Sequence, residues 1–332
     1  VLLKNEPVDG APCTPIIPRS SGLTLALVGR LAGLANTGDL GSSKVRPPKV
    51  VTAAEGFDGL AASHGIALRT SLSDSAAAAD RACAGADVAV VLVGNTWREE
   101  GEYVFAYGGD RTTLALLPKH EALIRAVAAR CPRTIVVLVG GSAFACGEWI
   151  NRVPCVMMSF YAGAEGGHAL AEVILGEHAP SGRLTSTWPA HDDQLPPFSR
   201  KADKLTYGPL HGYRYFHARK EEPLFWFGHG LSYGAIRWGK AEVRRDNAGN
   251  YLEVPLKNES QLPQHEVVQV YLYVALGTHP EPLPTLAGFV SVEVPPGEEL
   301  LARVQIDSKL ERRADTGAAI LVGRNAGSLT VV

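Results

Sequence analysis

Three carboxylates, an arginine and a tryptophan crowd into one short polar segment, residues 94–103. The segment directly follows an apolar run that ends at Val93, and Gly-Gly-Asp-Arg follows at residues 108–111. An aromatic face can cover the apolar side of a pyranose while charged groups bind its hydroxyls. A glutamate that donates a proton near neutral pH needs a raised pKa, which neighbouring carboxylates can provide. The segment is a candidate sugar site, and a merely solvated loop is the competing interpretation; its candidate side chains are Trp97, Arg98, Glu99, Glu100 and Glu102.

A second glycine-rich loop, residues 29–43, follows another apolar run. It lacks the G-x-G-x-x-G spacing of a dinucleotide site, and the sequence contains no G-x-x-x-x-G-K-[ST] motif. A nucleotide-dependent enzyme is therefore disfavoured. Two interpretations stay open: a long loop that uses Asp39 as a local cap, and a loop that lines the same pocket as the Glu100 segment.

Other kinds of catalytic site find no support in the sequence. The ten histidines show no metal-ligand spacing, and residues 140–144 do not form a G-x-S-x-G nucleophile elbow. The five cysteines are widely spaced without a C-x-x-C pair, which favours buried free thiols. We therefore expect neither a metal nor a cofactor.

Composition narrows the partners further. A formal net charge of -2, with both signs interspersed along the chain, gives no basic surface for nucleic acid or an anionic membrane. No apolar stretch reaches the roughly 18 residues that a membrane span requires. The expected partner is a neutral small molecule, while localisation, cytoplasmic or exported, and homo-oligomer formation stay open.

These loops need a scaffold, and the first half of the chain predicts a mostly parallel sheet. Continuous apolar runs are typical of strands covered on both faces, and helical spacing recurs between them. Alternation of this kind predicts an open α/β sheet with helices on both faces. The predicted strands are residues 23–28, 88–93, 134–139 and 154–159, and the predicted helices are residues 73–83, 119–130 and 165–175.

The second half has a different pattern. Residues 191–235 are rich in Pro, Gly and aromatics without a clear period, which indicates an ordered connector. Short alternating runs then predict an immunoglobulin-like or fibronectin-III-like β-sandwich over residues 236–332. The expected division is a linker at 1–22, an α/β domain at 23–190, the connector and the sandwich.

Several segments, taken together and in order, resemble the carboxyl-terminal portion of glycoside hydrolase family 3 of the β-glucosidase type. The start at residues 1–6 resembles the segment that leaves the family's amino-terminal barrel, and the end resembles its fibronectin-type-III-like domain. The motifs are NTGDLGSSKV (36–45), GDRTTL (109–114), YAGAEGGHAL (161–170), PSGRL (180–184) and PLFWFGHGLSY (223–233).

The resemblance implies a role for one glutamate. The family's general acid/base glutamate lies in an E-G context ahead of a D-R pair, which Glu100 and Gly101 match. Extra residues at 103–107 depart from the commonest pattern, so a two-residue slip would place the role on Glu102. Trp97, Arg98 and Asp39 would then shape the side of the site that binds the leaving group.

The resemblance also implies a missing half. The family's nucleophile is an aspartate on an N-terminal (β/α)8 barrel, and about 190 residues of α/β sequence are too few for that fold. We therefore expect one part of a retaining, exo-acting β-glucosidase that hydrolyses β-linked oligosaccharides or aryl glycosides and is inactive as this isolated chain. The alternative is a non-catalytic module that binds carbohydrate or protein.

Overall fold

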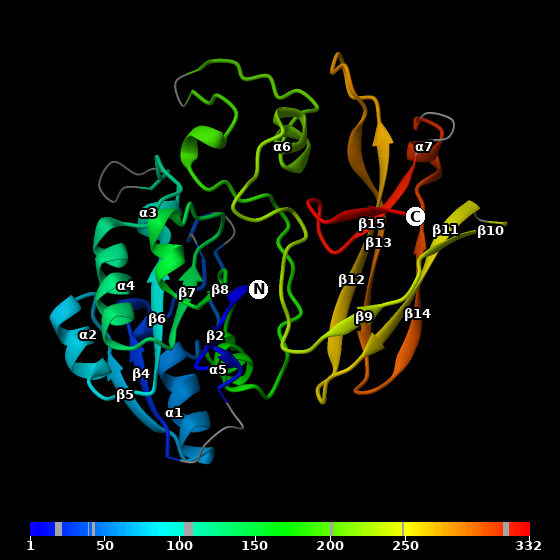
Figure 1. Ribbon diagram of the computed structural model, residues 1–332. Helices are drawn as coiled ribbons and strands as arrows, with labels where there is room; N and C mark the ends of the chain where they lie inside the picture. The colour runs from blue at the N-terminus through cyan, green and yellow to red at the C-terminus, as the bar shows by residue number, and fades with distance from the viewer. Residues whose placement is uncertain are drawn as a thin grey trace. The chain divides into compact units, whose positions relative to one another are not determined.

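The computed structural model describes residues 1–16, 22–38, 40–41, 44–102, 109–199, 202–247, 249–314 and 319–332. The chain divides into two compact units, Val1–His178 and Ala179–Val332 (Figure 1). Among the described residues, no helix has the length and apolar character that crossing a membrane would require.

The first unit contains one six-stranded sheet with the order β1-β8-β7-β6-β4-β5. Every neighbouring pair is parallel except β1 with β8. The chain first moves from β4 outward to β5 and then returns to build β6, β7 and β8 on the other side. The strands are β1 (Leu2–Asn5), β4 (Thr24–Val28), β5 (Ala67–Ser71), β6 (Val88–Gly94), β7 (Thr134–Val139) and β8 (Cys155–Met158), with a separate hairpin of β2 (Pro7–Val8) and β3 (Ala11–Pro12).

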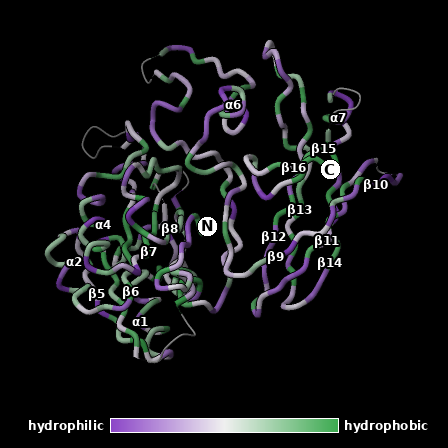
Figure 2. Tube along the Cα trace, in the orientation of Figure 1, coloured by the Kyte–Doolittle hydropathy of each residue, from purple (hydrophilic) through white to green (hydrophobic). Residues whose placement is uncertain are grey.

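The central strands confirm the predicted open sheet. Every residue of β6 and β7 is buried, as their uninterrupted apolar runs predict. Figure 2 shows the same strands as a hydrophobic centre within this unit. Residues 1–22, expected as a linker, include β1, which pairs antiparallel with β8 at the sheet edge.

Helices cover the sheet as two pairs, α1 with α5 and α2 with α4. Gly56 of α1 allows the first pair to approach closely, because a Cβ there would lie 2.2 Å from the Gly167 carbonyl oxygen of α5. Gly176 ends α5 in the left-handed conformation at φ 102°. The helical segments are α1 (Ala53–Ser63), α2 (Ala76–Cys83), α3 (Trp97–Glu100), α4 (Pro118–Arg130), α5 (Gly166–Leu175), η1 (Arg30–Gly33) and η2 (Gly147–Arg152).

The second unit is a sandwich of two antiparallel sheets, as predicted. One sheet has the order β10-β11-β14 with β9 also on β11, and the other has the order β13-β12-β15-β16. Alternate residues of β11 are buried, so each strand gives one face to the core. The strands are β9 (Ile236–Trp238), β10 (Glu242–Asp246), β11 (Gly249–Asn258), β12 (Gln264–Val274), β13 (Leu283–Val294), β14 (Glu299–Gln305), β15 (Ile320–Gly323) and β16 (Leu329–Val331).

The expected connector belongs to this second unit, which begins at Ala179. Fully buried Trp188 forms an antiparallel bridge with Phe225. An aromatic cluster around Tyr213 packs the connector against the fully buried Tyr271 of β12. The remaining helical segments of this unit are η3 (Asp192–Gln194), α6 (Tyr213–Arg219) and α7 (Ser308–Glu311).

Candidate active site

The short helix α3 stands at the carboxyl end of β6 (Figure 1). Gly94 ends the strand at φ 139°, and a Cβ there would lie 1.9 Å from the Val139 carbonyl oxygen of the neighbouring strand. Only glycine fits this close turn. Thr96 then caps the helix, and its backbone N–H and hydroxyl donate 2.8 Å hydrogen bonds to Glu99 Oε2. The Glu99 carboxylate is therefore held by the capping box, whereas the Glu100 carboxylate takes no part in it.

The carboxylate of Glu100 is almost enclosed, with 8% of its side chain exposed. Oε1 accepts a 3.0 Å hydrogen bond from Asn95 Nδ2 and lies 3.3 Å from Arg111 Nη2. Oε2 accepts hydrogen bonds from Gly141 N at 2.5 Å and from the Tyr161 hydroxyl at 2.7 Å. A carboxylate has about four lone-pair directions, so these four partners use its full capacity.

Arg111 is itself fixed in place. Its Nη2 donates to Ser142 Oγ and, over 2.7 Å, to the Ala143 carbonyl oxygen. Its guanidinium lies 5.1 Å from the centroid of the buried Phe144 ring. The loop after β7 therefore holds the arginine that pairs with Glu100.

A cavity of about 550 Å³ opens beside this carboxylate, and its size suits a small ligand. It lies where strand order reverses, since its walls follow the ends of β4, β6, β7 and β8. Open α/β sheets bind ligands at this reversal. The lining residues are Thr37, Gly38, Glu100, Asp110, Arg111, Gly141, Ser142 and Tyr161.

The predicted site residues are not all brought together. Glu100 lines the cavity, whereas Glu102 is exposed and does not. Arg98 is exposed, and its guanidinium lies 5.3 Å from the centroid of the Trp97 ring; neither lines the cavity. Asp39 falls outside the described residues, although Thr37 and Gly38 of its loop form part of the wall.

Sequence reasoning assigned no role to Asn95, Gly141, Ser142 or Tyr161. Each lies within three residues of the carboxyl end of a buried strand, which is the signal that could have found them. Tyr161 is 61 residues from Glu100, so only the strand order predicts that they meet.

No metal-binding arrangement accompanies these groups. Within the described ranges, no three His, Cys, Asp or Glu side chains gather as ligands would. All five cysteines are buried free thiols. The chemistry available here is that of a carboxylic acid held by neutral and cationic donors.

The sequence matches the family model described as "Glycosyl hydrolase family 3 C-terminal domain" over residues 1–233. It is 32% identical over 327 residues to "Thermostable beta-glucosidase B" of Acetivibrio thermocellus, which covers 93% of this chain and 42% of that protein. It is 31% identical over 280 residues to "Probable beta-glucosidase H" of Aspergillus flavus, covering 81% of this chain and 33% of that protein. The chain thus spans less than half the length of these curated relatives.

Solved structures share the fold over the whole chain. The beta-D-glucoside glucohydrolase of Trichoderma reesei superimposes with a TM-score of 0.86 at 23% identity, covering 100% of this chain and 53% of that one. The GH3 beta-glucosidase of Bifidobacterium adolescentis gives a TM-score of 0.82 at 25% identity, covering 100% of this chain and 51% of that one.

Proposed function

Because this chain belongs to the family of glycosyl hydrolase family 3 C-terminal domains, we propose that it is part of a retaining, exo-acting β-glucosidase. Glu100 is its general acid/base, and the nucleophilic aspartate lies on a (β/α)8 barrel outside this chain. The substrates are β-linked oligosaccharides or aryl glycosides. The relatives' names support the activity, since one is named a β-glucosidase and the other a probable β-glucosidase, and both are about two to three times as long as the chain.

One observation carries the assignment of Glu100. Among the three carboxylates of residues 99–102, it alone lines the cavity at the strand-order reversal. Glu99 is occupied by the capping box, and Glu102 is exposed outside the cavity wall. A general acid has to reach the leaving oxygen, so access favours Glu100 over its neighbours.

The partners of Glu100 also suggest which oxygen carries the proton. Oε1 faces Asn95 Nδ2 and Arg111 Nη2, which can only donate hydrogen bonds. Oε2 faces the Tyr161 hydroxyl, which can rotate and accept instead. Oε2 also accepts from Gly141 N, so a proton there would oppose one fixed donor and keep Tyr161 as a partner, whereas a proton on Oε1 would oppose two donors.

The mechanism then follows from a retaining pair of carboxyl groups about 5 Å apart. Glu100 protonates the glycosidic oxygen from Oε2 while the aspartate attacks the anomeric carbon. The resulting carboxylate regains the Tyr161 hydroxyl as a donor and next removes a proton from the attacking water. Arg111 and Asn95 hold Oε1 through both steps, so the side chain need not reorient.

The test uses the barrel-containing enzyme with Glu100→Gln and Glu102→Gln as a matched pair. Loss of the acid should slow substrates with poor leaving groups by about 10²- to 10⁴-fold. An activated aryl glycoside should instead show a burst followed by slow turnover, because the second step lacks its base. Azide needs no base, and it should restore the rate and yield a β-glycosyl azide.

The two variants have to behave differently for the proposal to stand. Burst and azide rescue in Glu100→Gln alone support it. The same signature in Glu102→Gln alone transfers the role to Glu102. If neither variant shows it, the acid lies outside this loop.

A further inference from the structure

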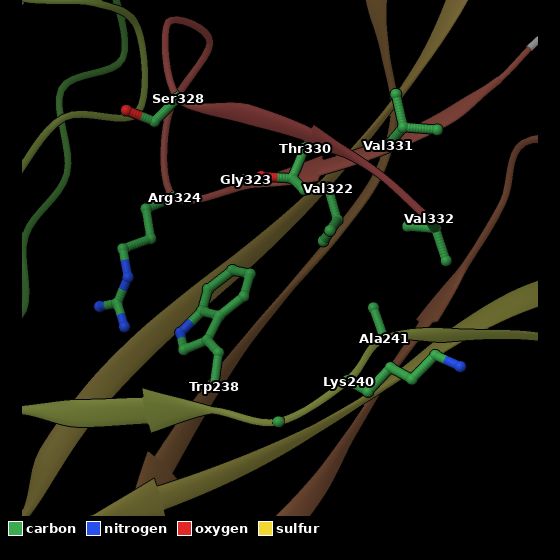
Figure 3. Close-up of a pocket in the computed structure, with 11 residues that line it drawn as sticks. Trp238, Lys240, Ala241, Val322, Gly323, Arg324, Ser328, Thr330, Val331 and Val332 are labelled. Carbon is green, nitrogen blue, oxygen red and sulfur yellow. The ribbon is translucent and has the colours of Figure 1, made fainter.

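A second cavity, of about 510 Å³, opens at an edge of the sandwich (Figure 3). One wall is the chain from Trp238 to Ala241, which leaves β9, and the other is formed by β15, β16 and the turn between them. Since β9 pairs with β11 and β16 pairs with β15, the two walls belong to different sheets. The volume lies within the range of small-ligand pockets.

The body of this cavity is apolar. Figure 3 shows the Val322 side chain pointing toward the Trp238 ring, with Ala241 and Val332 farther along the same space. The Trp238 indole is held in position by a 3.0 Å hydrogen bond from Nε1 to Glu266 Oε2. A fixed aromatic wall of this kind suits a flat apolar ligand.

One end of the cavity has an unbalanced charge. Glu266, 1% exposed, pairs with the guanidinium groups of both Arg183 and Arg324. Among the ion pairs of the described residues, neither arginine has a second carboxylate. Two cations therefore share one anion: the Glu266 side chain is almost fully buried, and the Arg183 and Arg324 side chains are 11% and 47% exposed.

Of the two cations that line the cavity, Lys240 and Arg324, it is Arg324 that lies beside the Trp238 ring. Its guanidinium lies 5.0 Å from the centroid of the Trp238 ring, donates to Glu266 and donates to the Ile236 carbonyl oxygen over 2.5 Å. Guanidinium has five N–H donors, so these bonds leave some for a ligand. Burial, opposed by Glu266 and reinforced by Arg183, lowers the pKa of Arg324 from its ordinary value. A second anion beside Arg324 would pair with the excess positive charge and offset the repulsion from Arg183.

We propose that this cavity binds a small organic carboxylate with a flat apolar body. The carboxylate binds Arg324, and the body lies between Trp238 and Val322. A neutral sugar fits less well, because the side-chain hydroxyls of the wall are only those of Ser328 and Thr330. A bare phosphate would leave the apolar wall unused.

Calorimetric titration of the full chain with 4-hydroxycinnamate tests the proposal, and 4-hydroxycinnamyl alcohol is the neutral control. We expect the acid to bind and the alcohol to bind at least about tenfold more weakly, because a charge-assisted hydrogen bond is lost. Equal binding of both compounds, or no binding of the acid, would overturn the proposal.

Two variants locate the binding. Arg324→Gln removes the ligand's charge partner while Arg183 still neutralises Glu266, and Ala241→Phe fills the cavity without changing charge. Each should weaken binding of the acid by about tenfold or more. The matched control is Arg244→Gln, which removes an exposed arginine of β10 and should leave binding unchanged.

Thermal unfolding of each variant establishes that the sandwich is folded. If Arg324→Gln unfolds, Ala241→Phe alone decides the question. Binding that survives in every folded cavity variant places the ligand elsewhere and refutes the site.

Discussion

Glu100 in the first unit and Glu266 in the second are each surrounded by hydrogen-bond donors, and the two sets of donors differ in their chemistry. Glu100 sits on a four-residue helix after a strand, beside a cavity, with one arginine and three neutral partners. Glu266 sits within β12, with two arginines, the Trp238 indole and the Val267 N–H around it. Their exposed side-chain fractions are 8% and 1%.

The difference lies in what the donors can do. The Tyr161 hydroxyl beside Glu100 can switch from donor to acceptor, so this site tolerates both a proton and its loss. The two guanidinium groups at Glu266 can only donate, so neither can switch its role as the Tyr161 hydroxyl can. A buried carboxylate with a switchable partner and access to a cavity suits chemistry, whereas one fixed by cations suits structure.

The largest expected effect is on turnover without the barrel. The isolated 332-residue chain should hydrolyse no aryl β-glucoside, because a retaining mechanism needs a second carboxyl group about 5 Å from Glu100. Rate measurements on the purified chain, before and after adding separately produced barrel, check this. Activity of the chain alone would instead direct attention to Asp110, the other carboxylate among the described residues that line the cavity.

The next effect is on stability and concerns the sandwich. Glu266→Gln removes the charge of a carboxylate that is 1% exposed and leaves the buried Arg183 without its anion, so it should lower the free energy of unfolding by about 3–5 kcal/mol. Denaturant titration followed by circular dichroism measures the loss. Glu293→Gln is the control, because this glutamate is 56% exposed and pairs only with His265 among the described ion pairs; its change should stay within about 0.5 kcal/mol. Equal losses would remove the structural role assigned to Glu266.

A smaller effect tests the switchable partner. Tyr161→Phe keeps the ring but removes the hydroxyl that donates to Glu100 Oε2, so poor leaving groups should react about 10- to 100-fold more slowly in the barrel-containing enzyme. Activated aryl substrates should lose less in their first step. Tyr207→Phe, at an exposed tyrosine, serves as the control. A uniform loss across all leaving groups would assign Tyr161 to binding instead.

The smallest effect is a pH dependence within the α/β unit. Burial lowers the pKa of His120 below its ordinary 6.5, against the opposing influence of Asp74, while Lys119 lowers it further and Glu99 raises it. The unfolded chain then binds the proton first, so stability should fall as pH drops below 6.5, by at most about 1.4 kcal/mol per pH unit for one group.

Unfolding curves at several pH values for the parent and His120→Gln measure this dependence. The variant should show a flatter profile in that window. His178→Gln, at a histidine whose side chain is 72% exposed, should retain the parent's slope. A parent profile that is already flat below pH 6.5 would contradict the expected linkage.

The sheet could be predicted where a strand is covered on both faces. The runs of β6 and β7 are apolar throughout, and their predicted and observed bounds nearly coincide. Strand β5 has no buried residue and no apolar run, so nothing in its composition identifies it. Helix α1 was missed because Gly56 and Gly59 weaken the helical pattern, although Gly56 is what lets the helix approach α5.

The candidate site also contains residues that the sequence could predict and residues that it could not. Glu100 could be proposed from its E-G context, because the signal lies in adjacent residues. Tyr161 and Gly141 could not, because they reach Glu100 only through the order of β6, β7 and β8 in the sheet. Trp97 and Arg98, which the resemblance places on the side that binds the leaving group, are not among the residues that line this cavity, and their role stays a prediction.

Two backbone hydrogen bonds beside α3 separate the position of Glu100 from the length of the sequence that follows it. Asp110 N donates to the Gly101 carbonyl oxygen at 2.9 Å, and Arg111 N donates to that of Glu99 at 3.0 Å. These bonds join the chain just before residue 102 to the chain just after residue 109, so the length in between need not alter the position of Glu100. Doubling the number of residues between two points joined in this way costs only about 0.6 kcal/mol in closure entropy. Changing the number of residues between these two joined points is therefore expected to leave the Glu100 carboxylate where it is.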